Sequence, residues 1–175
     1  VATSPGSNDN PTDAVVDAII NLEHSKKYLK PEVYYDIVEK VKANNNPIIL
    51  ESIIKEESHF NQYAKSFVGA SGLMQLMPAT YSEIAKNKGI SGDIFDIESN
   101  IKAGCAYYNN LKRALGNKDL YAISAYNGGI GSVTNWFSKI IYNDMDEFVE
   151  QIPYPETKNY VKKVLRTYWV YGNIY

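Results

Sequence analysis

The sequence predicts a single, mostly helical domain with at most one small β hairpin. Apolar residues recur at helical spacing along most of the chain, and prolines and glycines stand where these segments begin and end. One stretch, residues 63–74, carries two glycines among small residues, which is typical of a short hairpin or an irregular turn. A chain of 175 residues is long enough for one domain to bury a substantial core.

The beginning of the chain has two parts. Residues 1–12 are small, polar and turn-forming, so we expect a flexible lead-in or linker there. Residues 13–28 carry apolar side chains at helical spacing, which predicts a helix. We therefore expect the folded domain to occupy residues 13–175, with residues 13–30 as an N-terminal extension. The chain starts at Val1 without a methionine, which indicates a mature product or an excised fragment.

Prolines and glycines predict the remaining helices. A proline suits the first position of a helix and a glycine suits its end. We expect helices that open at Pro31 (ending at asparagines 44–46), at Pro47, and at Pro78 (ending at Gly89), a loop over 93–98, and further helices over 99–115, over 120–126, through Val133 to Ile140, after an Asp144–Glu147 capping box, and over 157–171.

Glu57 is the strongest candidate for acid–base chemistry. Leu50, Ile53 and Ile54 lie seven, four and three positions before it, on one face of a helix. Seven residues turn a helix by about 700°, so Glu57 lies within roughly 20° of Leu50. Burial raises the pKa of a carboxylic acid, which favours a general acid near neutral pH. Glu56, about 100° round the helix on a more polar face, is the competitor.

Composition excludes several classes of function. The net charge is −2 and no basic stripe is present, which disfavours nucleic acid as a partner. No apolar run of about 18 residues is present, so we expect no membrane-spanning segment. The lone cysteine, Cys105, excludes an internal disulfide, and no cluster of histidine, cysteine and carboxylate has metal spacing, so we expect no metal and no cofactor. Fifteen tyrosines suit either stacking on sugar rings or a core in which tyrosine replaces phenylalanine.

Five blocks of sequence carry a resemblance to a known family. They are ESHF at 57–60, GASGLMQLMPAT at 69–80, NIKAG at 100–104, AYNGG at 125–129 and ETKNYV at 156–161. Together and in this order they resemble the catalytic domain of the soluble lytic transglycosylases, glycoside hydrolase family 23. The likeness extends over residues 31–171.

The resemblance implies a lysozyme-like α+β fold with the small hairpin beside the active-site cleft. It also implies cleavage of the β-1,4 bond between N-acetylmuramic acid and N-acetylglucosamine in peptidoglycan, with formation of 1,6-anhydromuramoyl ends. Peptidoglycan glycan strands would be the substrate, in the periplasm or outside the cell, and other cell-wall machinery proteins are implied as partners. We expect a monomer.

The resemblance also assigns the site residues. Glu57 matches the catalytic acid/base, and Tyr126 matches a catalytic tyrosine that faces it. The matched substrate-binding residues are Ser58, Ser71, Gly72, Leu73, Met74, Gln75, Asn127 and Glu156.

Most of these positions have a purely structural interpretation as well. A serine or glutamate at a helix terminus can serve the backbone, and apolar residues in a turn can serve the core. This alternative stays open for Glu57 as a buried carboxylate bonded to backbone N–H groups, Ser58 and Glu156 as helix-terminus groups, Gln75 as a cap for the Pro78 helix, Leu73 and Met74 as core, and Tyr126 and Asn127 as a packed aromatic and a cap.

The sequence offers one good carboxylate where ordinary glycosidases use two. The best candidates for a second are Asp93, Asp96 and Glu98, in a loop. A single acid favours a route in which the substrate's own acetamido group and C6 hydroxyl take part. The alternatives are a lysozyme-type hydrolase of the same bond and a peptidoglycan-binding module without catalysis.

Overall fold

Eight helices account for most of residues 30–173, the part of the chain that the computed structural model describes. The prolines that were expected to open helices do so in α2, α3 and α4, and a proline also opens α9. The helices are α2 (Pro31–Lys42), α3 (Pro47–Ser58), α4 (Pro78–Lys88), α5 (Ile97–Ala114), α6 (Asp119–Gly128), α7 (Ile130–Phe137), α8 (Met145–Glu150) and α9 (Pro155–Gly172).

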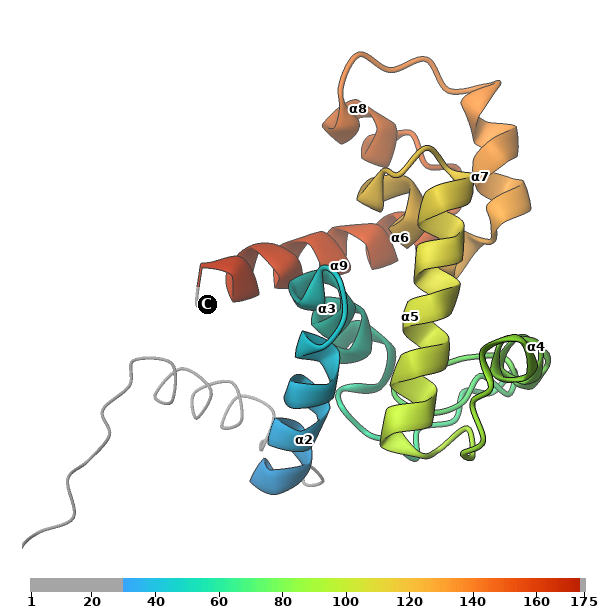
Figure 1. Cartoon of the computed structure of the whole chain (residues 1–175). Helices are drawn as coiled ribbons and strands as arrows, with labels where there is room; N and C mark the ends of the chain where they lie inside the picture. The colour runs from blue at the N-terminus through green and yellow to red at the C-terminus, as the bar shows by residue number, and fades with distance from the viewer. Residues whose placement is uncertain (1–29, 174–175) are drawn as a thin grey trace, which may run out of the picture.

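Helix α5 is the axis of the fold. Figure 1 shows it running through the middle of the molecule, with α4 beside one end and α6 and α7 at the other. Helices α2, α4 and α6 all pack against it. Helix α3 makes its most extensive contacts with α9, so the middle of the chain and its last helix lie together. The residues on either side of position 57 are thereby brought against a segment about a hundred positions further along the chain.

The core is built from the apolar faces that the sequence predicts. Ile49, Leu50, Ile53 and Ile54 on α3 are all buried, and they belong to one cluster with buried residues from every other described helix. Burial of such side chains contributes roughly 1.5–3 kcal/mol each. Because α3 contributes an almost continuous buried face, its last turn is fixed firmly in the fold.

Three helix ends differ in detail from the expectation. Helix α5 begins at Ile97, within the expected loop over 93–98, because the Asp96 carboxylate caps it by accepting a hydrogen bond from the Ser99 N–H at 2.8 Å. Asp144 caps α8 as expected, but the Glu147 carboxylate bonds the backbone N–H of Asn143 at 2.8 Å and not that of Asp144. Helix α7 ends at Phe137, before Ile140.

The predicted β hairpin is not formed. The described residues contain two isolated antiparallel bridges, Lys65 with Ser71 and Ser71 with Leu76. Gly72 and Gln75 have φ of 81° and 47°, so the chain reverses direction again within a few residues and no two extended runs lie side by side. The segment is the irregular turn that the sequence left as the alternative.

The lead-in over residues 1–12, the helix expected over 13–28 and nearly all of the extension 13–30 lie outside the described residues. Within residues 30–173, no helix combines the length and the apolar character needed to cross a membrane.

Candidate active site

Glu57 lies on the last turn of α3, on the face that carries the buried residues Leu50, Ile53 and Ile54. Its side chain is half-buried. Burial is the main reason that the pKa of its carboxyl rises from 4.5 to about 7, and the charge of Glu56 adds to the rise while the Tyr160 hydroxyl opposes it. A carboxylic acid with this pKa is protonated for an appreciable fraction of the time at neutral pH, as a general acid requires.

Glu56, the competing carboxylate, has a structural contact. Its Oε1 accepts a hydrogen bond from the Thr167 hydroxyl of α9 at 2.8 Å. This bond holds Glu56 as part of the α3–α9 interface. Glu57 is therefore the better candidate for the acid.

Two tyrosines from other helices accompany Glu57. Tyr126 belongs to α6 and Tyr160 to α9. Burial raises the pKa of both hydroxyls well above 10, and the charge of Glu57 raises both further, so both stay protonated at all working pH values. The Tyr126 hydroxyl donates to the carbonyl of Met74 at 2.8 Å. Its proton is therefore used to hold the turn segment, and Tyr107 of α5 packs on its ring at 5.3 Å.

The Tyr160 hydroxyl is buried and has no hydrogen-bond partner of regular geometry among the described residues. Because it lowers the pKa of Glu57, the Glu57 carboxylate is the group to which it can donate. The sequence analysis included Tyr160 only in the ETKNYV block and in the helix expected over 157–171, and missed it as a candidate site residue. The available signal was a hydroxyl within the ETKNYV block, on a face whose other members are buried and apolar.

Asn100 on α5 holds the turn segment that precedes α4. Its Oδ1 accepts from the Met74 N–H at 2.8 Å, and its Nδ2 donates to the carbonyls of Ser71 and Ile94 at 3.2 and 2.7 Å. A Cβ on Gly72 would lie 2.1 Å from Asn100 Nδ2, so only glycine allows this approach. One buried amide thus fixes the backbone of the Gly-Leu-Met-Gln block.

Gly104 on α5 gives the block a second support. A Cβ at this position would lie 2.3 Å from Met74 Sδ. The backbone N–H and C=O of Met74 are bonded to Asn100 and Tyr126, so the segment is held between α5 and α6. The turn is therefore a rigid part of the site despite its lack of regular structure.

Four of the predicted substrate-binding side chains serve the fold. Leu73 and Met74 have 0% exposure, which leaves no side-chain surface for a ligand and favours their interpretation as core. The Ser58 hydroxyl donates to the Ile54 carbonyl at 3.1 Å, and the Ser71 hydroxyl donates to the Gly69 carbonyl at 3.0 Å; both serines are buried. A direct sugar contact by these side chains stays a prediction that the geometry does not favour.

Of the remaining predicted binding residues, the three besides Gly72 are at least partly accessible. Gln75 is half-buried, and its Nε2 donates to the carbonyls of Ala64 and Gly72 at 3.0 and 2.9 Å, so it spans the turn and does not cap α4. Exposed Asn127 accepts from the Thr157 hydroxyl at 2.8 Å, which joins the end of α6 to the start of α9. Glu156, next to Thr157, is exposed in the first turn of α9.

The candidates for a second carboxylate have other partners. Asp93 accepts from the Phe95 N–H at 2.8 Å, Asp96 caps α5, and exposed Glu98 forms ion pairs with Lys102 and Lys40. None of the three is among the groups that shift the pKa of Glu57, where Glu56 is the carboxylate that contributes. Within the described part of the chain, the contacts of these three carboxylates link none of them to Glu57.

Neither of two surface hollows, of about 520 and 610 Å³, is lined by a residue assigned to catalysis or substrate binding. Residues 30–173 contain no group of three metal-binding side chains.

Cys105, near the site on α5, is buried, and burial raises the pKa of its thiol to about 12.

A helical fold that sets one half-buried carboxylic acid beside two tyrosine hydroxyls fits the class of polysaccharide-cleaving domains that work with a single acid. Residues 35–147 match the Transglycosylase SLT domain family, and the chain belongs to that family.

Curated relatives and solved structures agree with this family. The chain is 40% identical over 120 residues to the soluble lytic murein transglycosylase of Escherichia coli K12, a match that covers 65% of this chain and 19% of that protein. It is 30% identical over 168 residues to the membrane-bound lytic murein transglycosylase C of Histophilus somni, covering 86% of this chain and 44% of the relative. The chain thus spans about a fifth of the length of the E. coli relative.

Two solved structures have the same fold. The inactive glutamate-to-glutamine mutant of the lytic transglycosylase Slt from Pseudomonas aeruginosa superposes with a TM-score of 0.74 at 27% identity, over 93% of this chain and 29% of that one. The 70 kDa soluble lytic transglycosylase Slt70 of E. coli gives a TM-score of 0.70 at 33% identity, over 92% of this chain and 28% of that one.

Proposed function

We propose that this domain is a peptidoglycan lytic transglycosylase. It cleaves the β-1,4 bond between N-acetylmuramic acid and N-acetylglucosamine and leaves a 1,6-anhydromuramoyl end, with Glu57 as general acid and then general base. The observation that carries the proposal is the half-buried Glu57 with a pKa of about 7, whose neighbouring carboxylate, Glu56, is held by the Thr167 hydroxyl. A hydrolase with two carboxylates needs a partner acid, whereas this reaction does not.

In the first step, protonated Glu57 donates its proton to the glycosidic oxygen. The bond from C1 of the muramic acid to that oxygen breaks, and the N-acetylglucosamine part of the strand leaves with a new hydroxyl. The carbonyl oxygen of the muramic acetamido group stabilises the positive charge that develops at C1. Glu57 becomes a carboxylate in a poorly solvated place, which makes it a good base for the next step.

In the second step, the C6 hydroxyl of the same sugar attacks C1, and its proton passes to Glu57. A C6–O–C1 bond forms, the acid is restored, and no water is consumed. The nucleophile is already part of the sugar, so the step gains from proximity. The Tyr160 hydroxyl stabilises the carboxylate form of Glu57 between the two steps, and Tyr126 and Asn100 keep the turn segment in place.

The proposed substrate places the activity in the cell envelope, outside the cytoplasmic membrane. The relatives include a soluble and a membrane-bound lytic murein transglycosylase, which supports action on murein in either setting. Gln75, Asn127 and Glu156 are the proposed contacts to the glycan or its peptide stems, because their side chains are at least partly accessible.

Digestion of purified sacculi tests the proposal. Wild type and Glu57→Gln are incubated with sacculi, and the released muropeptides are analysed by mass spectrometry. We expect anhydro ends from wild type and a loss of rate of about 10²–10⁴-fold in Glu57→Gln, the range of general acid catalysis. Glu56→Gln is the matched control, a neighbouring glutamate on the same helix turn, and it should still give anhydro ends.

Other outcomes select the alternatives. Reducing ends would make the enzyme a lysozyme-type hydrolase. Full activity in Glu57→Gln would remove the catalytic assignment. Binding of wild type to sacculi with no product would indicate a module without catalysis.

A further inference from the structure

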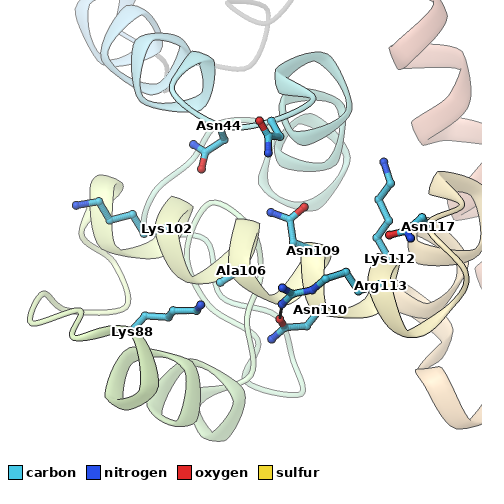
Figure 2. A pocket seen from close by; sticks show the side chains of 10 residues that line it. Asn44, Lys88, Lys102, Ala106, Asn109, Asn110, Lys112, Arg113 and Asn117 are labelled. Atoms are coloured by element: carbon cyan, nitrogen blue, oxygen red, sulfur yellow. Dashed lines mark hydrogen bonds between the residues drawn. The ribbon is translucent and has the colours of Figure 1, made fainter.

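A hollow without acidic residues runs along α5, separate from the Glu57 site. It has a volume of about 520 Å³ and is formed by the turn between α2 and α3, the end of α4, helix α5 and the turn after it (Figure 2). Its lining consists of three lysines, one arginine, five asparagines and Ala106. The chain has 20 aspartates and glutamates and a net charge of −2, yet none of these carboxylates lines the hollow. This surface is therefore positive on an otherwise acidic protein.

Two of the four cations are available to a ligand. Lys102 forms an ion pair with Glu98 at 2.5 Å, and Lys112 forms one with Asp119 at 2.7 Å. Neither of these carboxylates lines the hollow. Lys88 and Arg113 form no ion pair with a carboxylate of residues 30–173. Arg113 donates one hydrogen bond to Asn110 Oδ1 at 2.5 Å, which still leaves guanidinium donors for an anion.

The asparagines supply neutral donors and acceptors. The side-chain amides of Asn45, Asn109 and Asn117 make no hydrogen bond with the described part of the protein. Each can therefore donate a hydrogen bond to a ligand and accept one from it. Asn44 donates to the carbonyls of Lys40 and Val41 at the end of α2, which leaves its Oδ1 to accept. Such a surface matches a ligand whose own groups alternate between donor and acceptor.

The hollow has the length of a short peptide. Figure 2 shows Lys88 and Lys102 toward one end and Lys112 and Arg113 toward the other, with Asn109 between them. Lys102 marks the end of the hollow at which the available Lys88 lies, and it is eleven positions from Arg113 on α5, which is about 16 Å at 1.5 Å per residue. An extended peptide of about five residues has that length. The spacing suits a ligand with a carboxylate near each end.

The helix ends around the hollow argue against a compact, densely charged anion. Asn44, Lys88 and Arg113 stand at or next to the C-terminal ends of α2, α4 and α5. C-terminal carbonyls carry partial negative charge, whereas phosphate groups are usually bound at helix N-termini. A ligand that brings amide N–H groups as well as separated carboxylates is therefore favoured over a phosphate polymer.

We propose that this hollow binds an acidic peptide of about five residues, and that in the envelope this ligand is a stem peptide of peptidoglycan on a strand other than the one being cut. The identification of the source rests on the proposed function; the peptide chemistry rests on the lining alone. The hollow would hold the domain on the wall while the Glu57 site is turning over.

Titration with a synthetic stem pentapeptide tests the proposal. The protein is Glu57→Gln, labelled with ¹⁵N, and chemical shifts are followed by NMR. We expect saturable shifts at Asn109, Asn117 and Arg113, and at least about tenfold weaker binding in the Lys88→Glu/Arg113→Glu double variant. The double variant Lys86→Glu/Arg166→Glu makes the same change of charge at exposed residues outside the lining, and should bind as the parent does.

Three results with unmodified ligands would overturn the proposal. They are an absence of shifts in the lining at millimolar peptide, equal weakening by the two double variants, and binding of a glycerol-phosphate oligomer with no binding of the peptide. A pentapeptide with its carboxylates amidated should lose the interaction, and retention would equally count against it. The titration does not depend on turnover, so a failure of the proposed function in the sacculus assay is seen separately from a failure here.

Discussion

The raised pKa of Glu57 is the net result of three local effects on its carboxyl. Burial raises the pKa, Glu56 raises it further, and Tyr160 lowers it. The two neighbours act in opposite directions, so they can be tested separately. In kcat/KM the free enzyme must carry the proton on Glu57, so activity should fall as pH rises through about 7.

Tyr160→Phe should move this alkaline limb to higher pH. The change removes the hydroxyl that favours the charged form, so the pKa of Glu57 rises. Glu56→Gln removes a like charge and should move the limb to lower pH. The measurement is the pH profile of kcat/KM on soluble glycan strands for the three proteins. Shifts in the same direction for both variants would contradict the assignment.

The charged form of Glu57 should also destabilise the folded protein. Its pKa is about 7 in the folded protein against 4.5 for the free group, so the native state holds the proton more tightly and stability declines as pH rises from about 4.5 to 7. The difference corresponds to about 3 kcal/mol above pH 7. Glu57→Gln should therefore be more stable than wild type by about 2–3 kcal/mol at pH 8 and by little at pH 4.5, measured by denaturant unfolding. An equal gain at both pH values would point to packing and not to charge.

At the scale of elements, the helices were predictable and the turn segment was not. Pro31, Pro47, Pro78 and Gly89 mark helix ends because a ring-fixed φ or a left-handed φ acts within one or two residues. The backbone over 63–76 depends instead on Asn100, which lies at least 24 positions away in the sequence and bonds two backbone groups of the segment, the Met74 N–H and the Ser71 carbonyl. No local pattern contains that information, so a hairpin and an irregular turn could not be distinguished.

Gly104→Ala should damage the turn segment. The new methyl group would meet Met74 Sδ at 2.3 Å, and overpacking of this kind costs about 1–3 kcal/mol. Gly131→Ala in α7 is the matched control: its Cβ would meet nothing within 4 Å, and it should stabilise the helix by about 0.5–1 kcal/mol. Thermal unfolding measures both changes, and kcat on sacculi should fall in Gly104→Ala alone. An unchanged stability and kcat in Gly104→Ala would mean that the turn segment can shift to accommodate the methyl group.

At the scale of the whole molecule, the site exists because helices remote in sequence share one core. Glu57 comes from α3, Tyr126 from α6 and Tyr160 from α9, and all three helices belong to the same buried cluster. The sequence predicted Glu57 from its own helix face, and Tyr126 from a family resemblance. It could not predict that Tyr160 faces Glu57, because that contact depends on how α9 crosses α3.

Unfolding of the domain should therefore be one cooperative transition. Buried residues from all the described helices form a single cluster, so no helix pair has a core of its own. In a Trp169→Phe variant, in which Trp136 is the one remaining tryptophan, fluorescence and far-UV circular dichroism should give the same midpoint in urea. Two separate midpoints would show that α7 and α8 unfold independently of the α3–α9 pair.

The burial of the Cys105 thiol has a practical consequence for labelling the protein. It is the chain's one cysteine, it is buried, and with a pKa of about 12 it carries almost no thiolate at neutral pH. Maleimide reagents should therefore not react with Cys105 in the native protein. A single cysteine introduced at an exposed position such as Lys86 would then accept a spin label or fluorophore selectively, with the native thiol left in place.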